Sequence, residues 1–415
     1  MRDTGRGRCP HPGHLAPCAL KGPPFASSRR IGPLLDVPTA IDGSQSRPAQ
    51  EAARDASHRG PRVTRSGDAS GGSRVGRRRV SVGFRRDRAC AAAHCAHVAH
   101  RESPMRFDGI YTPIVTPHRA DFSIDRDALA DVIEHLLAAG VHGIILAGTT
   151  GEYYAQTPEE RVALMPFVKE RIAGRAPLIV GTGAIRTEDS IAYAEAAKAA
   201  GADALLVATP PYAYPTGREI ALHALAIDRA ANLPVMLYNY PGRMSVNMDE
   251  ECLDRLGRSP NFCGIKESSG DPNRLHMLAR DYPHIQLGCG MDDQALEFFA
   301  WGARFWVCAG SNFAPEAHIA LWRACVVQGD FAKGRAIMMA MLPLLRVLEQ
   351  GGKFVQCIKY GMDLRGIPCG PPRRPLQPLN KDDKRELAEV VRTMDAAIAA
   401  IDAASPVAAE KRAAE

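Results

Sequence analysis

The chain has 415 residues, of which 46% are hydrophobic and 24% are charged, so it can bury a sizeable core and is not a disordered protein throughout. No apolar stretch reaches the ~18 residues of a membrane helix and no secretory signal opens the chain, so we predict a cytoplasmic protein without membrane contact. The net charge of +6 comes from an arginine-rich stretch at residues 1–104, and the mildly acidic remainder gives no reason to expect nucleic-acid binding there.

Residues 1–104 are rich in Arg, Gly, Pro, Ser and Ala, and Phe25 and Phe84 are their only aromatic residues. Such a segment buries too little apolar surface to offset the entropy of ordering, so we predict a disordered leader. A transit peptide would fit its arginine-rich, acid-poor composition, and a nucleic-acid-binding tail is another interpretation. We favour a third, in which translation begins at Met105, because the regular pattern of the chain starts directly after it.

From Gly109 onward, short apolar runs alternate with amphipathic segments, which predicts strands followed by helices. This α/β pattern is typical of a (β/α)8 TIM barrel, which we place at residues 105–328. A doubly wound sheet is the alternative, but it usually carries a glycine-rich loop after its first strand, and no such loop is present here. The predicted strands are 110–116, 143–147, 178–181, 204–208, 235–238, 264–266, 286–288 and 305–308, and the predicted helices are 125–139, 158–173, 187–200, 217–231, 248–256, 271–281, 292–300 and 315–327.

Residues 329–402 contain helical patterns without strands, and we predict a helical appendix on the barrel there. Two glycines at 351–352 and a proline-rich stretch at 368–378 separate its helices. Residues 403–415 are predicted to be a frayed tail. The predicted helices of the appendix are 330–350, 353–363 and 381–401.

Lys266 closes an apolar strand, and in barrels of this type the catalytic groups lie at the C-terminal ends of the strands. Lysine is seldom buried without a partner, and burial lowers the pKa of its ammonium group. The neutral amine attacks a ketone to form an iminium, which then withdraws electrons from the neighbouring carbon. The structural alternative is a lysine whose amine extends into solvent at the barrel rim.

A Schiff-base site also needs a proton carrier and a group that binds a carboxylate. Tyr238 ends the preceding strand and can carry protons if it is hydrogen-bonded to another hydroxyl, such as that of Thr149. Thr150 and the backbone amides of the same loop can hold a carboxylate. A buried tyrosine and a glycine-flanked tight turn are ordinary structural features, so only their combination with Lys266 predicts an active site.

Other titratable residues have structural interpretations. The Asp292-Asp293 pair resembles paired catalytic carboxylates, but we favour a cap of the following helix. The 11 cysteines lack the spacing of a zinc site and are expected to be reduced thiols. We expect no metal and no organic cofactor, because the lysine imine itself supplies the electron sink. Five histidines also lack metal spacing and are expected at surface or helical positions, namely His118, His135, His142, His223 and His318.

Over residues 107–400, several separated motifs resemble those of the dihydrodipicolinate synthase/N-acetylneuraminate lyase family and follow one another in the same order. The first signature is similar to GIILAGTTGE at residues 143–152, and the second to YNYP at 238–241 followed by Lys266. Three shorter matches are GTGA at 181–184, GADA at 201–204, and Lys359-Tyr360 with the Pro-Leu pairs at 375–376 and 378–379.

The resemblance implies a class I, Schiff-base-forming lyase or synthase on a (β/α)8 barrel, assembled as a homotetramer (a dimer of dimers). It implies that Lys266 binds pyruvate or a related 2-oxo acid, that Tyr238 relays protons, and that Thr149 links Tyr238 to Tyr212 of a neighbouring subunit. The implied substrate-binding residues are Thr150 for the 2-oxo acid carboxylate, Arg243 for a second carboxylate, and Gly290 and Val307 along the pocket wall.

The sequence departs from the synthases around this catalytic set, which leaves the substrate open. Ile185 and Pro211 replace residues that bind feedback lysine in many synthases, so we do not expect a lysine-regulatory pocket. The activity is either that of 4-hydroxy-tetrahydrodipicolinate synthase or that of a paralogous aldolase, dehydratase or deaminase of a hydroxylated 2-oxo acid, with a non-catalytic oxo-acid-binding protein as a further alternative. Larger or altered side chains stand near the expected pocket at Tyr153, Tyr154, Tyr240 and Met244.

Overall fold

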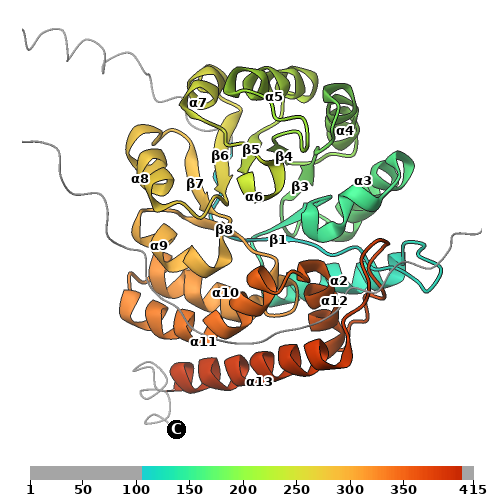
Figure 1. Ribbon diagram of the computed structural model, residues 1–415, viewed down its shortest axis with the longest axis vertical. Helices are drawn as coiled ribbons and strands as arrows, with labels where there is room; N and C mark the ends of the chain where they lie inside the picture. The colour runs from blue at the N-terminus through green and yellow to red at the C-terminus, as the bar shows by residue number, and fades with distance from the viewer. Residues whose placement is uncertain (1–104, 404–415) are drawn as a thin grey trace, which may run out of the picture. The chain divides into compact units, whose positions relative to one another are not determined.

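The computed structural model describes residues 105–403. The predicted disordered leader and most of the predicted frayed tail lie outside these residues. The described part of the chain contains a closed barrel of eight parallel strands, because β1 pairs with both β2 and β8, and this confirms the predicted TIM barrel (Figure 1). Among the described helices, none is long and apolar enough to cross a membrane.

The strands are short and almost entirely buried, as expected of parallel strands covered by helices. The first strand ends at Pro113 rather than at residue 116, and the sixth begins earlier than predicted, at Phe262. The strands are β1 (Gly109–Pro113), β2 (Gly143–Leu146), β3 (Leu178–Gly181), β4 (Ala204–Ala208), β5 (Val235–Asn239), β6 (Phe262–Glu267), β7 (Gln286–Cys289) and β8 (Phe305–Val307).

The helices of the barrel follow the strands in turn. Several carry the caps that the sequence predicts, including the capping box of Thr157 with Glu160 at the start of α3. The helices are α2 (Arg126–Ala139), α3 (Pro158–Ile172), α4 (Thr187–Ala199), α5 (Gly217–Ala231), α6 (Pro241–Met244), α7 (Glu250–Leu256), α8 (Pro272–Asp281), α9 (Ala295–Ala300) and α10 (Pro315–Trp322).

The structure contains several short helical turns. Some lie in segments that were predicted as loops, and others form part of segments that were predicted as longer helices. The loop after β2 forms two 3-10 turns, η1 (Thr149–Gly151) and η2 (Tyr153–Ala155). A further 3-10 turn, η3 (Asp292–Gln294), precedes α9, and another, η4 (Gly310–Asn312), precedes α10. The π-helical turn η5 (Arg323–Val327) ends the segment that was predicted as one helix.

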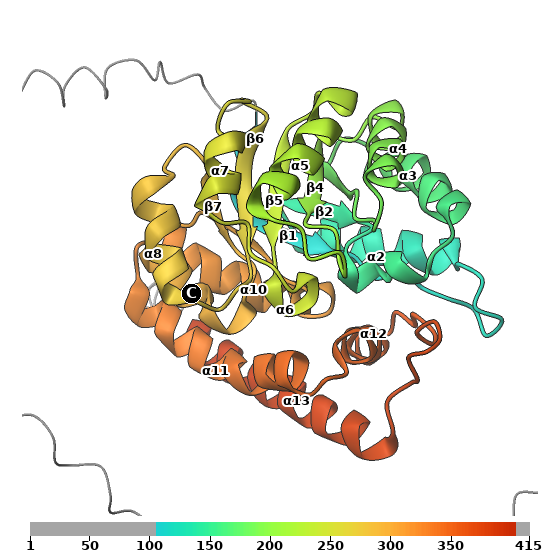
Figure 2. The same ribbon diagram turned by 45° about the horizontal axis from the view of Figure 1, so that its top comes forward.

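Up to residue 403, where the described chain ends, three helices follow the barrel: α11 (Phe331–Gln350), α12 (Phe354–Leu364) and α13 (Lys381–Ala403). Both views show α11 beside α13, and Figure 2 shows the three helices on the side of the barrel where α6 follows β5. Because α6 marks the C-terminal end of a strand and α12 packs against η1, these helices adjoin the mouth of the barrel. Residues of these helices can therefore reach the C-terminal ends of the barrel strands.

Two apolar cores result from the alternation of side chains along the strands. One lies between the strands and the helices, and the second fills the interior of the barrel. Met236 and Tyr238 both belong to the inner core, as expected for residues two apart on one strand. Glycine makes room for this core at Gly288, where an added Cβ would lie 2.1 Å from the ring of Phe305.

Candidate active site

Lys266 lies near the C-terminal end of β6 and is only 9% exposed. It pairs in register with Tyr238 of β5, and its Nζ lies 4.3 Å from the centroid of the Tyr238 ring. Within residues 105–403, Lys266 makes no hydrogen bond or ion pair. Burial lowers the pKa of its ammonium group, and the more distant carboxyl groups of Asp292 and Glu349 oppose this effect only in part.

Gly290 follows β7 and leaves space for the lysine. A Cβ at this position would lie 2.7 Å from Cγ of Lys266 and 2.1 Å from Oγ of Ser268. The hydroxyl of Ser268 donates a hydrogen bond to the backbone carbonyl of Gly290, which fixes this loop against the end of β6. Any larger residue at 290 would therefore displace the amine from its position.

Tyr238 is 6% exposed at the end of β5. Burial raises the pKa of its phenol, whereas the positive charge of Arg243 and a hydrogen bond with Thr149 favour the phenolate. The phenol therefore stays protonated at neutral pH and can donate a proton beside the lysine amine. Thr149 and Tyr238 line the same cavity, as the sequence analysis expected of residues that act together.

The loop after β2 holds the two threonines at the mouth of the barrel. Gly151 is required in η1, since an added Cβ would lie 2.9 Å from the backbone oxygen of Ile114. Glu152 ends this turn with a left-handed backbone (φ 57°). Thr150 is buried and Thr149 is half-buried, and both line the same cavity as Lys266.

One cavity at this mouth brings together all the predicted site residues except Tyr212, which is 85% exposed and lies outside it. Arg243 borders the cavity, and its guanidinium lies 5.5 Å from the ring centroid of Tyr240 and 5.7 Å from that of Phe354. The predicted residues that line the cavity are Lys266, Tyr238, Thr149, Thr150, Arg243, Gly290 and Val307.

The sequence analysis did not assign Asp292, Glu349 or Phe354 to this cavity, although all three line it. The interpretation of Asp292 as a helix cap is wrong, because its carboxylate accepts a hydrogen bond of 2.8 Å from Trp306 Nε1 and the starts of η3 and α9 have no side-chain cap. The pKa of Asp292 is raised to about 8, first by burial and then by the charge of Glu349, while the hydrogen bond from Trp306 and the charge of Lys266 oppose the rise. No sequence signal marks Glu349 or Phe354, because they come from helices that follow the barrel.

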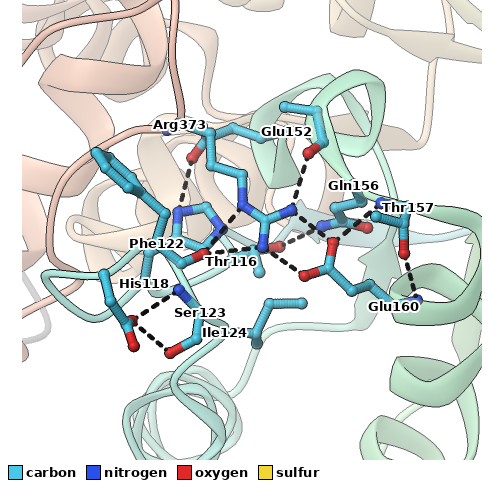
Figure 3. A network of polar contacts seen from close by, with 12 residues as sticks. Thr116, His118, Phe122, Ser123, Ile124, Glu152, Gln156, Thr157, Glu160 and Arg373 are labelled. Carbon is cyan, nitrogen blue, oxygen red and sulfur yellow. Dashed lines mark hydrogen bonds and ion pairs between the residues drawn. The ribbon is translucent and has the colours of Figure 1, made fainter. Parts of the chain in front are cut away.

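A second polar cluster ties the β2 loop to the C-terminal region (Figure 3). Lys359 of α12 lies 2.8 Å from Glu152 and 2.9 Å from Nδ1 of His118, and all three side chains are buried. The expectation of a surface or helical position is therefore wrong for His118. The guanidinium of Arg373 pairs with the carboxylate of Glu160, and its backbone N–H donates to Glu152 at 2.7 Å. Figure 3 shows Phe122, Glu152 and Glu160 around Arg373, which joins the C-terminal region to the first part of the barrel.

The remaining titratable groups do not extend the site. The described cysteines are buried, and no group of three potential ligands for a metal ion occurs in the part of the chain that the structure describes. His223 and His318 are buried in α5 and α10, and burial lowers the pKa of each imidazole to about 4. Both imidazoles are therefore neutral at physiological pH.

Comparison with known proteins agrees with this geometry. The model of the dihydrodipicolinate synthetase family matches residues 106–394. A 4-hydroxy-tetrahydrodipicolinate synthase of Bacillus velezensis is 32% identical over 288 residues, which cover 69% of this chain and 99% of the relative.

Solved structures give the same result. The 4-hydroxy-tetrahydrodipicolinate synthase of Methylacidiphilum fumariolicum superposes with a TM-score of 0.68 at 29% identity, covering 72% of this chain and 99% of that one. YagE of Escherichia coli K12, a prophage protein of the dihydrodipicolinic acid synthase family solved in complex with pyruvate, gives a TM-score of 0.66 at 28% identity, covering 70% and 99%. The match runs from before β1 into α13 and includes every residue of the cavity, so the chain belongs to the dihydrodipicolinate synthetase family, as its motifs predicted.

Proposed function

We propose that this protein is a Schiff-base-forming lyase or synthase that acts on pyruvate or a related 2-oxo acid, with Lys266 as the amine. The observation that carries the proposal is a buried lysine without an ion-pair partner in the described chain, in a cavity beside a tyrosine. Such a lysine loses its proton more easily than an exposed one and is then nucleophilic.

The proposed chemistry begins with attack of the neutral Lys266 amine on C2 of the 2-oxo acid. One proton of the amine passes to the former carbonyl oxygen and Tyr238 donates a second, so that this oxygen leaves C2 as water and the lysine nitrogen becomes a protonated imine. Thr149 supports this role because its hydroxyl is bonded to the phenol of Tyr238. Thr150, at the same loop, is proposed to hold the substrate carboxylate.

Two activities remain for the step that follows. Condensation with aspartate semialdehyde, as in 4-hydroxy-tetrahydrodipicolinate synthase, is supported by Arg243, a cation that borders the cavity and has no ion pair within the described residues. An aldolase, dehydratase or deaminase reaction on a hydroxylated 2-oxo acid is supported by Tyr240 and Phe354, which narrow the cavity around this arginine. Both activities use the same imine.

We also propose that the protein acts as a homotetramer, in which Tyr212 completes the site of a neighbouring subunit. Tyr212 is 85% exposed and has a left-handed backbone (φ 72°), a conformation that costs energy for a non-glycine residue. Tyr214 and Ile185 are exposed as well, at 66% and 63%. A second copy that covers this apolar surface would account for all three.

The first experiment is borohydride trapping of the purified full chain with pyruvate, followed by peptide mass analysis. We expect a stable adduct on Lys266 alone. An adduct on another lysine would overturn the assignment. The absence of any adduct in folded protein, with pyruvate and with longer 2-oxo acids, would instead favour a binding protein that has kept the lysine without the chemistry.

A further inference from the structure

Glu349 brings an acidic group from outside the barrel into the proposed active site. It lies in the last turn of α11, and the chain then turns at Gly351 and Gly352, where Gly352 has a positive φ of 69°. This turn allows α11 and α12 to contribute Glu349 and Phe354 to the same cavity wall. The position of Glu349 therefore depends on how the two helices are joined.

The Glu349 carboxyl group has no hydrogen bond or ion pair anywhere in residues 105–403. Other carboxylates near the barrel mouth have partners, since Glu152 pairs with Lys359, Glu267 pairs with Arg274, and Asp292 accepts from Trp306. Oδ1 of the half-buried Asp293 also has no hydrogen-bond partner among the described residues, but Asp293 does not line this cavity. Burial raises the pKa of Glu349, and the positive charges of Lys266 and Arg243 lower it. An unpartnered polar group that lines a cavity has hydrogen-bonding capacity left for a ligand.

The charges around Glu349 restrict what that ligand group can be. Lys266 becomes a cationic imine when it binds a 2-oxo acid, and Arg243 is a second cation that lines the same cavity. A carboxylate on the substrate would be drawn to Arg243 and repelled by Glu349. A cationic group on the substrate would be repelled by the Lys266 imine and by Arg243. A neutral hydroxyl can instead donate a hydrogen bond to Glu349 without adding charge.

We infer that Glu349 is a specificity-determining residue that accepts a hydrogen bond from a hydroxyl group on the substrate carbons between the imine and the end held by Arg243. This inference rests on the proposed function and deepens it, because it favours hydroxylated 2-oxo acids as the substrate class. Glu349 is not required for imine formation itself. Pyruvate, which carries no hydroxyl, cannot make this hydrogen bond.

The test compares 4-hydroxy-2-oxoglutarate with 2-oxoglutarate, which lacks only the hydroxyl. The half-saturating concentration of each acid is measured by rapid borohydride trapping on Lys266, and the adduct mass separates intact substrate from cleavage products. We expect the native protein to favour the hydroxylated acid by about tenfold or more, the worth of one hydrogen bond to a charged group. Glu349→Leu is expected to abolish this preference while pyruvate is still trapped on Lys266.

Gln350→Leu is the matched control, because Gln350 occupies the next position of the same helix and lies outside this cavity. It should retain the preference. Equal half-saturation of the two acids in the native protein, or an unchanged preference in Glu349→Leu, would overturn the inference while the proposed function stands. A failure of the native protein to form an imine with any of the three acids would remove the proposed function, and this inference with it.

Discussion

Two lysines of this protein are buried to a similar degree but differ in their hydrogen-bond and ion-pair partners. Lys266, at the mouth of the barrel, is 9% exposed, and Lys359, at the seam between the β2 loop and α12, is 2% exposed. Burial is the main cause that lowers the pKa of both. Burial by itself therefore does not separate a reactive lysine from a structural one.

The polar partners of the two ammonium groups distinguish Lys359 from Lys266. Lys359 lies 2.8 Å from a Glu152 oxygen, 3.0 Å from the backbone oxygen of Pro371 and 2.9 Å from Nδ1 of His118. All three favour a protonated, immobile ammonium group. Lys266 has no such partner among the described residues, and its only close neighbour on a ring face is Tyr238. The comparison indicates that a buried amine is available for chemistry when its charge is left without local compensation.

The most severe test of this difference is removal of each amine in turn. Lys266→Ala is expected to abolish the borohydride-trapped adduct with pyruvate completely, because no other buried amine faces this cavity within the described residues. Lys359→Met should still be labelled on Lys266 wherever it is folded. Peptide mass analysis checks both results, and labelling of Lys359 in the native protein would break the comparison.

Replacement of Lys359 should destabilise the protein more than replacement of Lys266, the reverse of their effects on labelling. Lys359→Met leaves the buried Glu152 carboxylate uncompensated and is expected to lower the free energy of unfolding by about 3–5 kcal/mol, as measured by urea denaturation. Glu152→Gln combined with Lys359→Met should recover part of this loss. Lys266→Met removes no ion pair and is expected to change the free energy of unfolding by less than about 1 kcal/mol. Equal losses for the two single variants would contradict the assignment of roles.

Substitution of Tyr238, which lies beside Lys266, tests the proposed proton relay. Tyr238→Phe keeps the ring in the inner core but removes the phenol that is bonded to Thr149. We expect the rate of deuterium exchange at the methyl group of pyruvate to fall roughly 10²-fold, the range for lost general acid–base catalysis. Tyr240→Phe is the control, since its ring centroid lies 6.0 Å from that of Tyr238. A near-native rate in Tyr238→Phe would move the proton relay to another group.

His118, which lies beside Lys359, is expected to make a smaller and pH-dependent contribution to the free energy of unfolding. Burial, and then the charge of Lys359, lower the pKa of His118 from 6.5 to about 4. Between these values the unfolded chain binds a proton that the folded chain does not, so stability falls as the pH decreases from 6.5 towards 4. This histidine should account for about 1–3 kcal/mol of the loss. His118→Asn should unfold with a shallower pH dependence in thermal melts, and an unchanged slope would show that His118 titrates normally.

Sequence reasoning predicted the barrel well because strand-and-helix alternation is a local pattern. It also placed Lys266 and Tyr238 together, since the ends of neighbouring parallel strands meet at one rim. It was less accurate for the loops: the turns η1, η2 and α6 are set by close contacts such as that of Gly151 with Ile114. Those contacts join residues that are distant along the chain, and no local pattern encodes them.

Asp292 and His118 show where local rules fail. Asp292 precedes a helix and fits the composition of a cap, yet its side chain turns inward to Trp306 because the interior offers a donor at 2.8 Å. His118 follows a strand that ends early, and its environment is formed by α12 and by Pro371, more than 200 residues later in the chain. In both cases a distant partner outweighs the local preference.

The sequence by itself determined the order of strands and helices, the position of the lysine and tyrosine at one end of the barrel, and the family resemblance, because these follow from patterns of neighbouring residues. Only the tertiary structure decided which buried lysine is left without a partner. It also decided that α11 and α12 complete the cavity with Glu349 and Phe354, and that Tyr212 stands apart from it in a single chain. The physical reason is that burial, charge compensation and cavity shape depend on groups that folding brings together from distant parts of the chain.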